Sequence, residues 1–299
     1  MLAALLRAPA LTDTAVIVNE FGEVGLDHRL VARGEEDSVV LLENGCLCCS
    51  AGDSLGETLT DLFHRRARGE IPHFSRVIIE TSGMADPTAI LATLLADRFM
   101  AGKYRISAVI TTIDAEHGRQ TVRRYAEAAA QLALADRLVI TKCDRIYPAA
   151  AADLRCWLRT ENPRADILMS SHGEGEVPDL LAPAPPMADA AVMAEHRHHA
   201  HHSIGVATIF LPIPDPVSWE RYAALVSALQ SYGRGLLRTK GLIRIDGEAG
   251  LLAIQGVRRL FAPPVPLPDN ISARTGLVLI GEELDREGLQ AALALALGH

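Results

Sequence analysis

The sequence predicts a two-domain α/β protein in which a mostly parallel sheet covered by helices precedes a smaller α+β domain. Two observations support this prediction. Up to residue 175, short apolar runs rich in β-branched residues alternate with helix-like stretches, which is typical of a parallel sheet covered on both faces. Over residues 176–202 the chain is rich in proline, alanine and histidine and loses regular periodicity, which indicates a linker. We therefore expect domains at 1–175 and 203–299, separated by this linker.

Each expected element follows from its local pattern. Strands of the first domain are expected where apolar runs end in polar or turn-forming residues, at 14–20, 38–44, 76–83, 106–114, 137–144 and 165–171. Helices are expected between them, over 54–69, 86–100, 119–135 and 150–161. In the second domain we expect strands at 204–214, 235–247, 251–263 and 274–281, with helices over 218–233 and 285–297.

Composition and charge exclude several classes of protein. With 49% hydrophobic and 22% charged residues the chain is globular rather than disordered. No apolar run reaches the ~18 residues that a membrane span requires, and "MLAALLRAPA" lacks the features of a secretory signal. We therefore expect a cytoplasmic protein without a membrane partner. A net charge of -8 and the lack of a long basic block argue against nucleic acid as a partner.

Three of the five cysteines, Cys46, Cys48 and Cys49, lie within four residues in "ENGCLCCS". A disulfide is disfavoured because adjacent cysteines rarely pair and cytoplasmic thiols stay reduced. The spacing is also too tight for a closed four-thiolate zinc knuckle. Two thiolates and a third ligand, such as Glu23 or a histidine, would form an open site for Zn²⁺ or Cu(I), which suits a metal that must be handed on. The alternative is a tight apolar turn that happens to contain sulfur.

Two further segments carry residues that bind metals. Glu23 lies in the acidic, glycine-containing stretch "VNEFGEVGLDH", which suits a metal or a switch segment, although a plain solvated loop has the same composition. The linker contains "EHRHHAHH", and such histidine tracts bind divalent metals loosely. A polar linker without function is the alternative for this tract.

Nucleotide-binding residues are expected where two strands end, because ligands of parallel α/β sheets bind at the carboxyl ends of the strands. The segment "TKCD", with Thr141, Lys142 and Asp144, matches the NKxD pattern by which GTPases read guanine, with threonine in place of asparagine. The alternative for Asp144 is a helix cap. The segment "IIETSG", with Glu80 and Gly83, resembles the acidic-x-x-Gly element that senses a γ-phosphate. The alternative for this segment is a plain strand-to-helix turn, and one segment can be such a turn and also sense the phosphate.

These motifs in this order resemble the CobW-like family of P-loop GTPases, which includes metallochaperones and cobalamin-pathway proteins. The resemblance rests on "VIVNEFGEVGLDH", "ENGCLCC", "VIIETSGMADP" and "ADRLVITKCD" in the first domain, and on "GLLRTKGLIRIDG" and "QGVRRLF" in the second. It implies that Cys46, Cys48 and Cys49 are metal ligands, and it makes Glu80 the nucleotide-linked acid. It also assigns guanine recognition to Lys142 and Asp144.

The sequence departs from the family at one point. The family begins with a strand and a phosphate loop of the form G-x-x-x-x-G-K-[ST], and no such motif occurs in this sequence. The two explanations are a start site placed too late and a true member without the loop. An in-frame motif in the DNA upstream of Met1 favours the first, and a stop codon there favours the second. The loop would supply an N–H cradle for the phosphates and a central strand of the sheet.

The resemblance implies a GTP-dependent metallochaperone that carries Zn²⁺ to a client metalloprotein and uses GTP with Mg²⁺. Two other functions stay open, a non-catalytic metal-binding adaptor and a Co²⁺-handling protein of cobalamin synthesis. Thiolate, imidazole and carboxylate ligands accept both Zn²⁺ and Co²⁺, so the sequence does not separate the two metals. GTP hydrolysis by the chain as given is undecided because the phosphate loop is absent, and a homodimer is kept as a candidate assembly.

Overall fold

A computed structural model describes residues 13–18, 39–43, 51–172, 174–175, 180, 205–232, 235–268 and 273–298. The chain divides into two compact units. One comprises Met1–Thr93 and Ala108–Pro183, and the other comprises Leu94–Ser107 and Ala184–His299. The expected linker, 176–202, lies outside the described residues except for residue 180, so the domain boundaries at 175 and 203 stay predictions.

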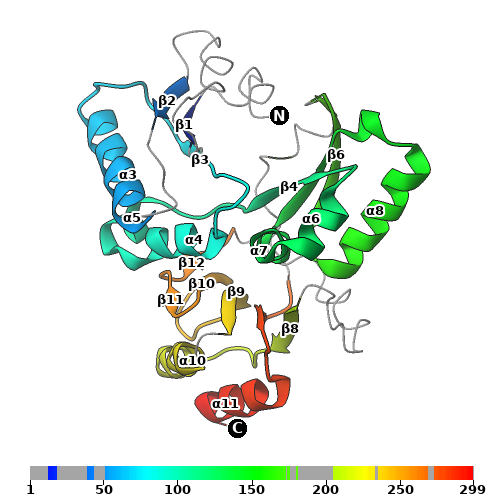
Figure 1. The fold of residues 1–299 in the computed structure, drawn as a ribbon. Coiled ribbons are helices and arrows are strands. Elements are labelled where there is room, and N and C mark those ends of the chain that lie inside the picture. Colours follow the sequence, from blue (N-terminus) through cyan, green and yellow to red (C-terminus); the bar gives the residue numbers. More distant parts are fainter. Residues whose placement is uncertain are drawn as a thin grey trace. The chain divides into compact units, whose positions relative to one another are not determined.

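The first unit contains a three-stranded parallel sheet (Figure 1) in the order β2-β1-β3, formed by β1 (Thr14–Val18), β2 (Val39–Glu43) and β3 (Arg76–Glu80). The apolar run of β1 is fully buried, as expected for a strand with neighbours on both sides. Helix α3 (Ala51–Ala67) buries three leucines at helical spacing, Leu55, Leu59 and Leu62. In register, Val18 at the end of β1 lies opposite both Glu43 and Glu80, so the three strands end at one level of one edge.

A second sheet of the same unit has the order β4-β5-β6-β7. The strands β4 (Ile110–Asp114), β5 (Arg137–Thr141) and β6 (Asp166–Ser171) are parallel, and the short β7 (Glu174–Gly175) is antiparallel to β6. Three helices belong to this part of the chain, α6 (Gly118–Arg124), α7 (Ala126–Leu134) and α8 (Pro148–Glu161). In register, Asp114 at the end of β4 lies opposite Thr141 at the end of β5.

The two sheets of the first unit are hydrogen-bonded separately. Strand β3 is the edge of one and β4 is the edge of the other, and no strand pairing joins them in the part of the chain that the structure describes. The parallel α/β architecture expected from the sequence is confirmed. The Cys46–Cys49 segment and the Glu80–Gly83 segment follow strands of the first sheet, whereas Lys142 and Asp144 follow a strand of the second.

Two expected helices are divided. The stretch 86–100 forms α4 (Pro87–Ala96) and α5 (Arg98–Lys103), because the Asp97 carboxylate accepts hydrogen bonds from the amides of Phe99 at 2.6 Å and Met100 at 3.1 Å and so begins a new helix. The stretch 119–135 is likewise divided at Tyr125, which has extended backbone angles between α6 and α7. The expected strand at 106–114 is shorter, beginning only at Ile110.

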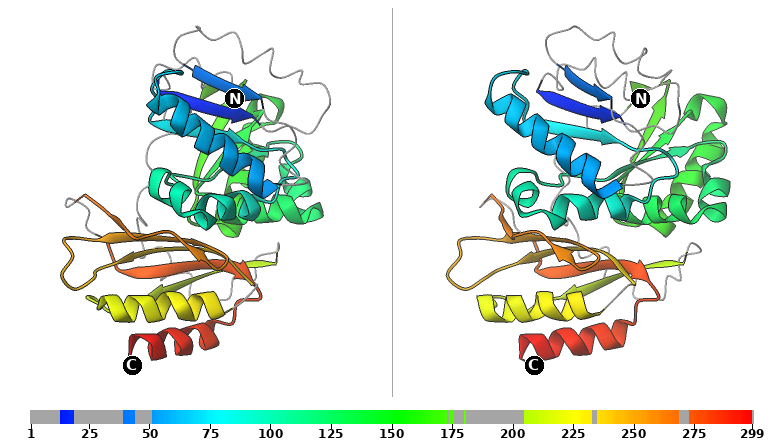
Figure 2. Two further views of the ribbon diagram at one scale, coloured as in Figure 1. Left: turned by 90° about the vertical axis from the view of Figure 1, so that its left-hand side faces the viewer. Right: turned by 60° about the vertical axis from the view of Figure 1, so that its left-hand side comes forward.

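The second unit contains an antiparallel sheet with two helices (Figure 2), and α5 also belongs to this unit. The strands of this sheet are β8 (Val206–Pro212), β9 (Leu236–Ile243), β10 (Leu252–Val257), β11 (Leu260–Phe261), β12 (Val265–Pro266) and β13 (Gly276–Glu282). Their order in the sheet is β11-β10-β9-β13-β8, and β12 also pairs with β10. Helices α10 (Trp219–Ser231) and α11 (Arg286–Leu297) contribute Leu225, Leu229, Leu289 and Leu293 to one core with the sheet. They begin at Ser218 and Asp285, whose side chains accept from backbone amides as N-caps. The smaller α+β domain is therefore confirmed.

Among the residues that the structure describes, none of the helices has the length and apolar character needed to cross a bilayer.

Candidate nucleotide-binding site

The Glu80–Gly83 segment forms the turn between β3 and α4. Glu80 ends β3, and α4 begins at Pro87 with the Asp86 carboxylate accepting from the amide of Thr88 at 2.8 Å and from its hydroxyl at 2.5 Å. The strand-to-helix turn expected as the structural alternative is therefore present. A Cβ added at Gly83 would meet no atom within 4 Å, so packing among the described residues does not require glycine there. This leaves close approach of a ligand as a reason for the glycine.

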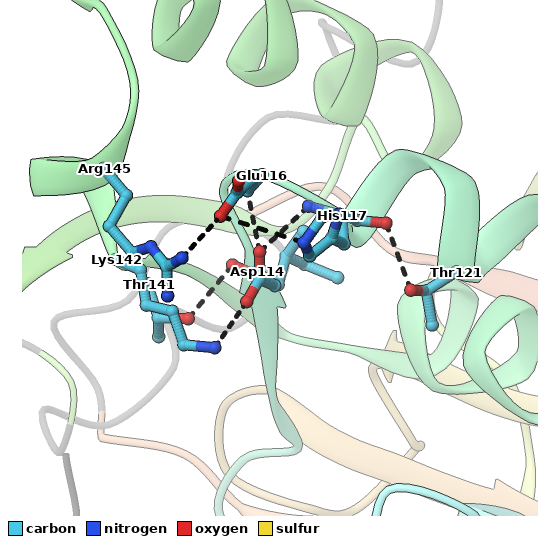
Figure 3. Close-up of polar contacts among 8 residues, drawn as sticks. Asp114, Glu116, His117, Thr121, Thr141, Lys142 and Arg145 are labelled. Atoms are coloured by element: carbon cyan, nitrogen blue, oxygen red, sulfur yellow. Dashed lines mark hydrogen bonds and ion pairs between the residues drawn. The ribbon is translucent and has the colours of Figure 1, made fainter.

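Lys142 follows β5 directly, in the left-handed region at φ 59° and ψ 34°. A residue with a Cβ is uncommon there, and such backbone strain concentrates at functional sites. Its ammonium group donates to the Asp114 Oδ2 atom at 2.6 Å, across the ends of β4 and β5 (Figure 3). Lys142, which is expected to read guanine, is thus held at the carboxyl edge of the second sheet.

Asp114 is the best-anchored carboxylate of this edge. Its Oδ1 atom accepts from the amides of Glu116 at 2.8 Å and His117 at 2.9 Å, while Oδ2 faces Lys142. Burial favours the neutral acid, but the Lys142 ammonium and the two amides outweigh it and lower the pKa of Asp114 to about 2. Asp114 is therefore a structural anchor of Lys142.

Asp144 lies in the short 3₁₀ turn Cys143–Arg145 that follows Lys142. Its Oδ2 atom lies 3.5 Å from the Nε2 atom of His172, which follows β6. His172 also has a left-handed backbone, with φ 53°. The side chain of Asp144 is 27% exposed and that of His172 is 79% exposed, so the imidazole is the more open of the two.

The remaining contacts rigidify the same edge. The hydroxyl of Thr141 donates to the carbonyl of Ile113 at 3.3 Å, which ties β5 to β4. The guanidinium of Arg145 pairs with Glu116 at 3.2 Å (Figure 3). The three residues expected to read guanine, Thr141, Lys142 and Asp144, are therefore brought together on well-supported backbone.

The expected metal ligands Cys46, Cys48, Cys49 and Glu23 lie outside the described residues. The strands before them are described, and in register Val18 of β1 lies opposite Glu43 of β2. No group of three or more potential metal-ligating side chains occurs among the described residues.

Sequence reasoning missed two side chains of this region. His172 could have been predicted from the sequence, because it follows β6 directly, just as Lys142 follows β5. Gln131 on α7 gave no signal, because it lies inside a helix and contacts the Glu80–Gly83 turn only in the folded chain.

Comparison with known proteins defines the class. Residues 1–169 match the family model of the CobW/HypB/UreG nucleotide-binding domain, and residues 206–297 match that of the cobalamin synthesis protein cobW C-terminal domain. The chain is thus a nucleotide-binding α/β domain joined to a domain of the CobW C-terminal type. It belongs to the CobW family, as the sequence motifs indicated.

The zinc chaperone YjiA of Escherichia coli is 32% identical to this chain, with 94% of this chain and 88% of YjiA aligned. The zinc chaperone CobW of Pseudomonas aeruginosa is 30% identical, with 95% and 84% aligned. The crystal structure of Zn(II)-bound YjiA GTPase from Escherichia coli superposes with a TM-score of 0.68 at 27% identity, covering 99% of this chain and 93% of that one. These relatives confirm the family and the fold.

One prediction concerns the Asp114–Lys142 pair. Asp114→Asn should lower the free energy of unfolding by about 1 kcal/mol at pH 7, a value discounted from the full shift because Lys142 is half exposed. Since the folded-state pKa of about 2 lies below the unfolded value of about 3.9, this contribution is complete above pH 4 and is lost as the pH falls through 2. Urea unfolding of the wild type and of Asp114→Asn, at pH 7 and at about pH 2.5, measures the difference in free energy of unfolding at each pH.

Asp153→Asn is the matched control for this prediction. Asp153 pairs with Arg119 at 2.8 Å but its side chain is exposed, so its removal should change the free energy of unfolding by less than about 0.5 kcal/mol. An Asp114→Asn effect that is equally small, or that does not shrink in acid, would contradict the anchoring role.

Proposed function

We propose that this protein is a zinc metallochaperone that binds Zn²⁺ through Cys46, Cys48 and Cys49 and passes it to a client metalloprotein under the control of a guanine nucleotide. One observation carries the proposal. The chain aligns over 94% of its length with a protein named a zinc chaperone, and it has three cysteines within four residues. In this proposal zinc is the cargo of the protein and not a resident cofactor.

Thiolate chemistry supports a transfer site. Thiolates bind Zn²⁺ strongly, and a site with few protein ligands leaves a position open for an incoming ligand of the client. Glu23 is the candidate carboxylate ligand, because its segment follows β1 in the sequence and the cysteine segment follows β2, the strand that pairs with β1. A client replaces the ligands one at a time, so the metal is never released free into solution.

The edge of the second sheet supports guanine recognition. The Asp144 carboxylate accepts hydrogen bonds, and the ring N–H and exocyclic amine of guanine are two adjacent donors that match its two oxygens. Lys142, held by Asp114, lies beside it to pack on the base. At the other sheet, Glu80 and Gly83 form the turn that senses the γ-phosphate. GTP with Mg²⁺, when bound, supplies a reaction whose free energy drives and times metal release.

The second candidate function is a metal-binding adaptor that recognises guanine weakly and does not hydrolyse GTP, since no G-x-x-x-x-G-K-[ST] motif occurs within these 299 residues. Cobalt in place of zinc is the other variant, since the same ligands accept both metals.

A paired measurement tests the proposal. Competition with a chromophoric chelator should give about one tightly bound Zn²⁺ per chain, and a colorimetric phosphate assay measures GTP turnover and so separates the two candidates. Failure to bind zinc would refute the metallochaperone. Robust GTP hydrolysis would exclude the adaptor. A parallel titration with Co²⁺ decides between the two metals.

A further inference from the structure

Gln131 on α7 holds the turn that follows β3. Its carboxamide nitrogen donates to the carbonyl oxygen of Gly83 at 3.1 Å and to that of Ala85 at 3.0 Å. A carboxamide has two N–H donors, and here both are used on one short turn. Two converging hydrogen bonds from one planar group fix the position and the orientation of this backbone more strictly than one would.

The helix that carries Gln131 is itself anchored to the second sheet. The hydroxyl of Thr111 on β4 donates to the carbonyl of Gln131 at 2.9 Å. The carboxamide of Asn162, which is 2% exposed, donates to the carbonyls of Leu132 at 2.8 Å and Ala135 at 3.0 Å, at the end of α7. Only two residues separate α7 from β5, so Gln131 is closely tied to the strand that precedes Lys142.

The two hydrogen bonds of Gln131 therefore cross between the two sheets of the first unit. The turn at 83–85 belongs to the segment after β3, and α7 belongs to the second sheet, with no strand pairing between β3 and β4 in the described residues. A change in the position of α7 and β5 is transmitted to the turn through these bonds. Conversely, a change in the turn reaches β5 by the same route.

We propose that Gln131 is a positioning residue that couples the guanine-reading end of β5 to the Glu80–Gly83 turn. Occupancy of the base site at Asp144 then alters the turn that senses the phosphate, without direct contact between the two. This inference rests on the proposed recognition of guanine nucleotides. It adds a residue and a route that neither the motifs nor the fold assignment contain.

Gln131→Glu is the sharpest variant, because it keeps the size of the side chain and removes both donors. An ionised carboxylate accepts only, so it repels the two carbonyl oxygens that Gln131 holds. Gln120→Glu is the matched control, since Gln120 is an exposed residue of α6 and the change in charge is the same. Gln131→Met removes the donors without adding charge and serves as a second variant.

Amide hydrogen exchange of the nucleotide-free protein gives the first readout. The segment 82–86 should exchange about tenfold faster in Gln131→Glu and Gln131→Met than in the wild type, while the amides of β5 keep their protection. Gln120→Glu should leave both segments unchanged. Equal exchange rates of the 82–86 amides in all four proteins would show that Gln131 does not hold the turn.

Millimolar GMP gives the second readout, because GMP has no γ-phosphate that could reach the turn directly. In the wild type, GMP but not AMP should slow exchange at 142–146 and, through Gln131, at 82–86. In Gln131→Glu only the slowing at 142–146 should remain. Slowing at both segments in the variant would overturn the coupling and leave guanine recognition intact. No slowing at 142–146 in the wild type would instead refute the proposed nucleotide recognition, and the coupling with it.

Discussion

The double variant Cys48→Ser/Cys49→Ser is expected to lose the tightly bound zinc of the wild type. A serine hydroxyl is not ionised at pH 7 and is a poor ligand for Zn²⁺, so two of the three proposed thiolate bonds disappear. Loss of an outer-shell partner alone costs 10- to 100-fold in metal affinity, so removal of two direct ligands should cost more than about 100-fold. Chelator competition and elemental analysis after gel filtration measure the affinity and the stoichiometry.

The chain offers a matched control in its other two cysteines. Cys143 is half-buried, with its thiol 3.3 Å from the carbonyl of Ile140, and Cys156 is exposed on α8. Cys143→Ser/Cys156→Ser removes the same number of thiols and should bind zinc like the wild type. The chelator also strips metal held loosely by the histidines of the linker. Undiminished zinc in Cys48→Ser/Cys49→Ser would refute the thiolate assignment.

Leu138→Ala is expected to lower the free energy of unfolding of the first unit by about 3 kcal/mol, within the range of 2–5 kcal/mol measured for buried leucines. Leu138 is the second residue of β5, opposite Thr111 of β4 and Ile167 of β6, and it is 0% exposed. Truncation leaves a cavity that the close-packed strands on both sides cannot fill. Because β5 carries Lys142 and Asp144, the same variant should weaken guanine recognition.

Urea unfolding followed by tryptophan fluorescence measures this loss for the first unit alone. The two tryptophans are Trp157 on α8 and Trp219 on α10, so in a Trp219→Phe background the signal reports the first unit. Tyr147→Ala is the control, since Tyr147 belongs to the same unit, is 84% exposed and should cost less than about 0.5 kcal/mol. A loss below 1 kcal/mol for Leu138→Ala would contradict the central place of β5 in the core.

Much of the fold was readable from local pattern. All six strands expected in the first domain occur, although two end earlier than expected, at Glu80 and Thr141. Apolar runs of β-branched residues indicate buried parallel strands, and they can be recognised in the sequence even when the neighbouring strands are not known. The divided helices were missed because Asp97 and Tyr125 interrupt stretches whose apolar periodicity continues across them.

The candidate site was predicted in part. Of the residues expected to read guanine, Thr141 ends β5, and Lys142 and Asp144 follow it, at the strand end where ligands of such sheets bind. The partners of these residues were not predicted. Asp114 and His172 are 28 residues away from the side chains that they contact, Lys142 and Asp144 respectively, and no local pattern pairs them. The metal assignment for Cys46, Cys48, Cys49 and Glu23 stays a prediction.

The sequence by itself determined the alternation of strands and helices, the kind of chemistry available in "ENGCLCCS" and "TKCD", and the resemblance to the CobW family, because these depend on residue type and spacing along the chain. Only the tertiary structure decided which distant groups meet. The register of β4 and β5 places Asp114 beside Lys142, and the position of α7 places the carboxamide of Gln131 against two carbonyls of the Gly83 turn. Such contacts depend on strand order and on backbone conformations, such as the left-handed Lys142, that long-range packing stabilises against local preference.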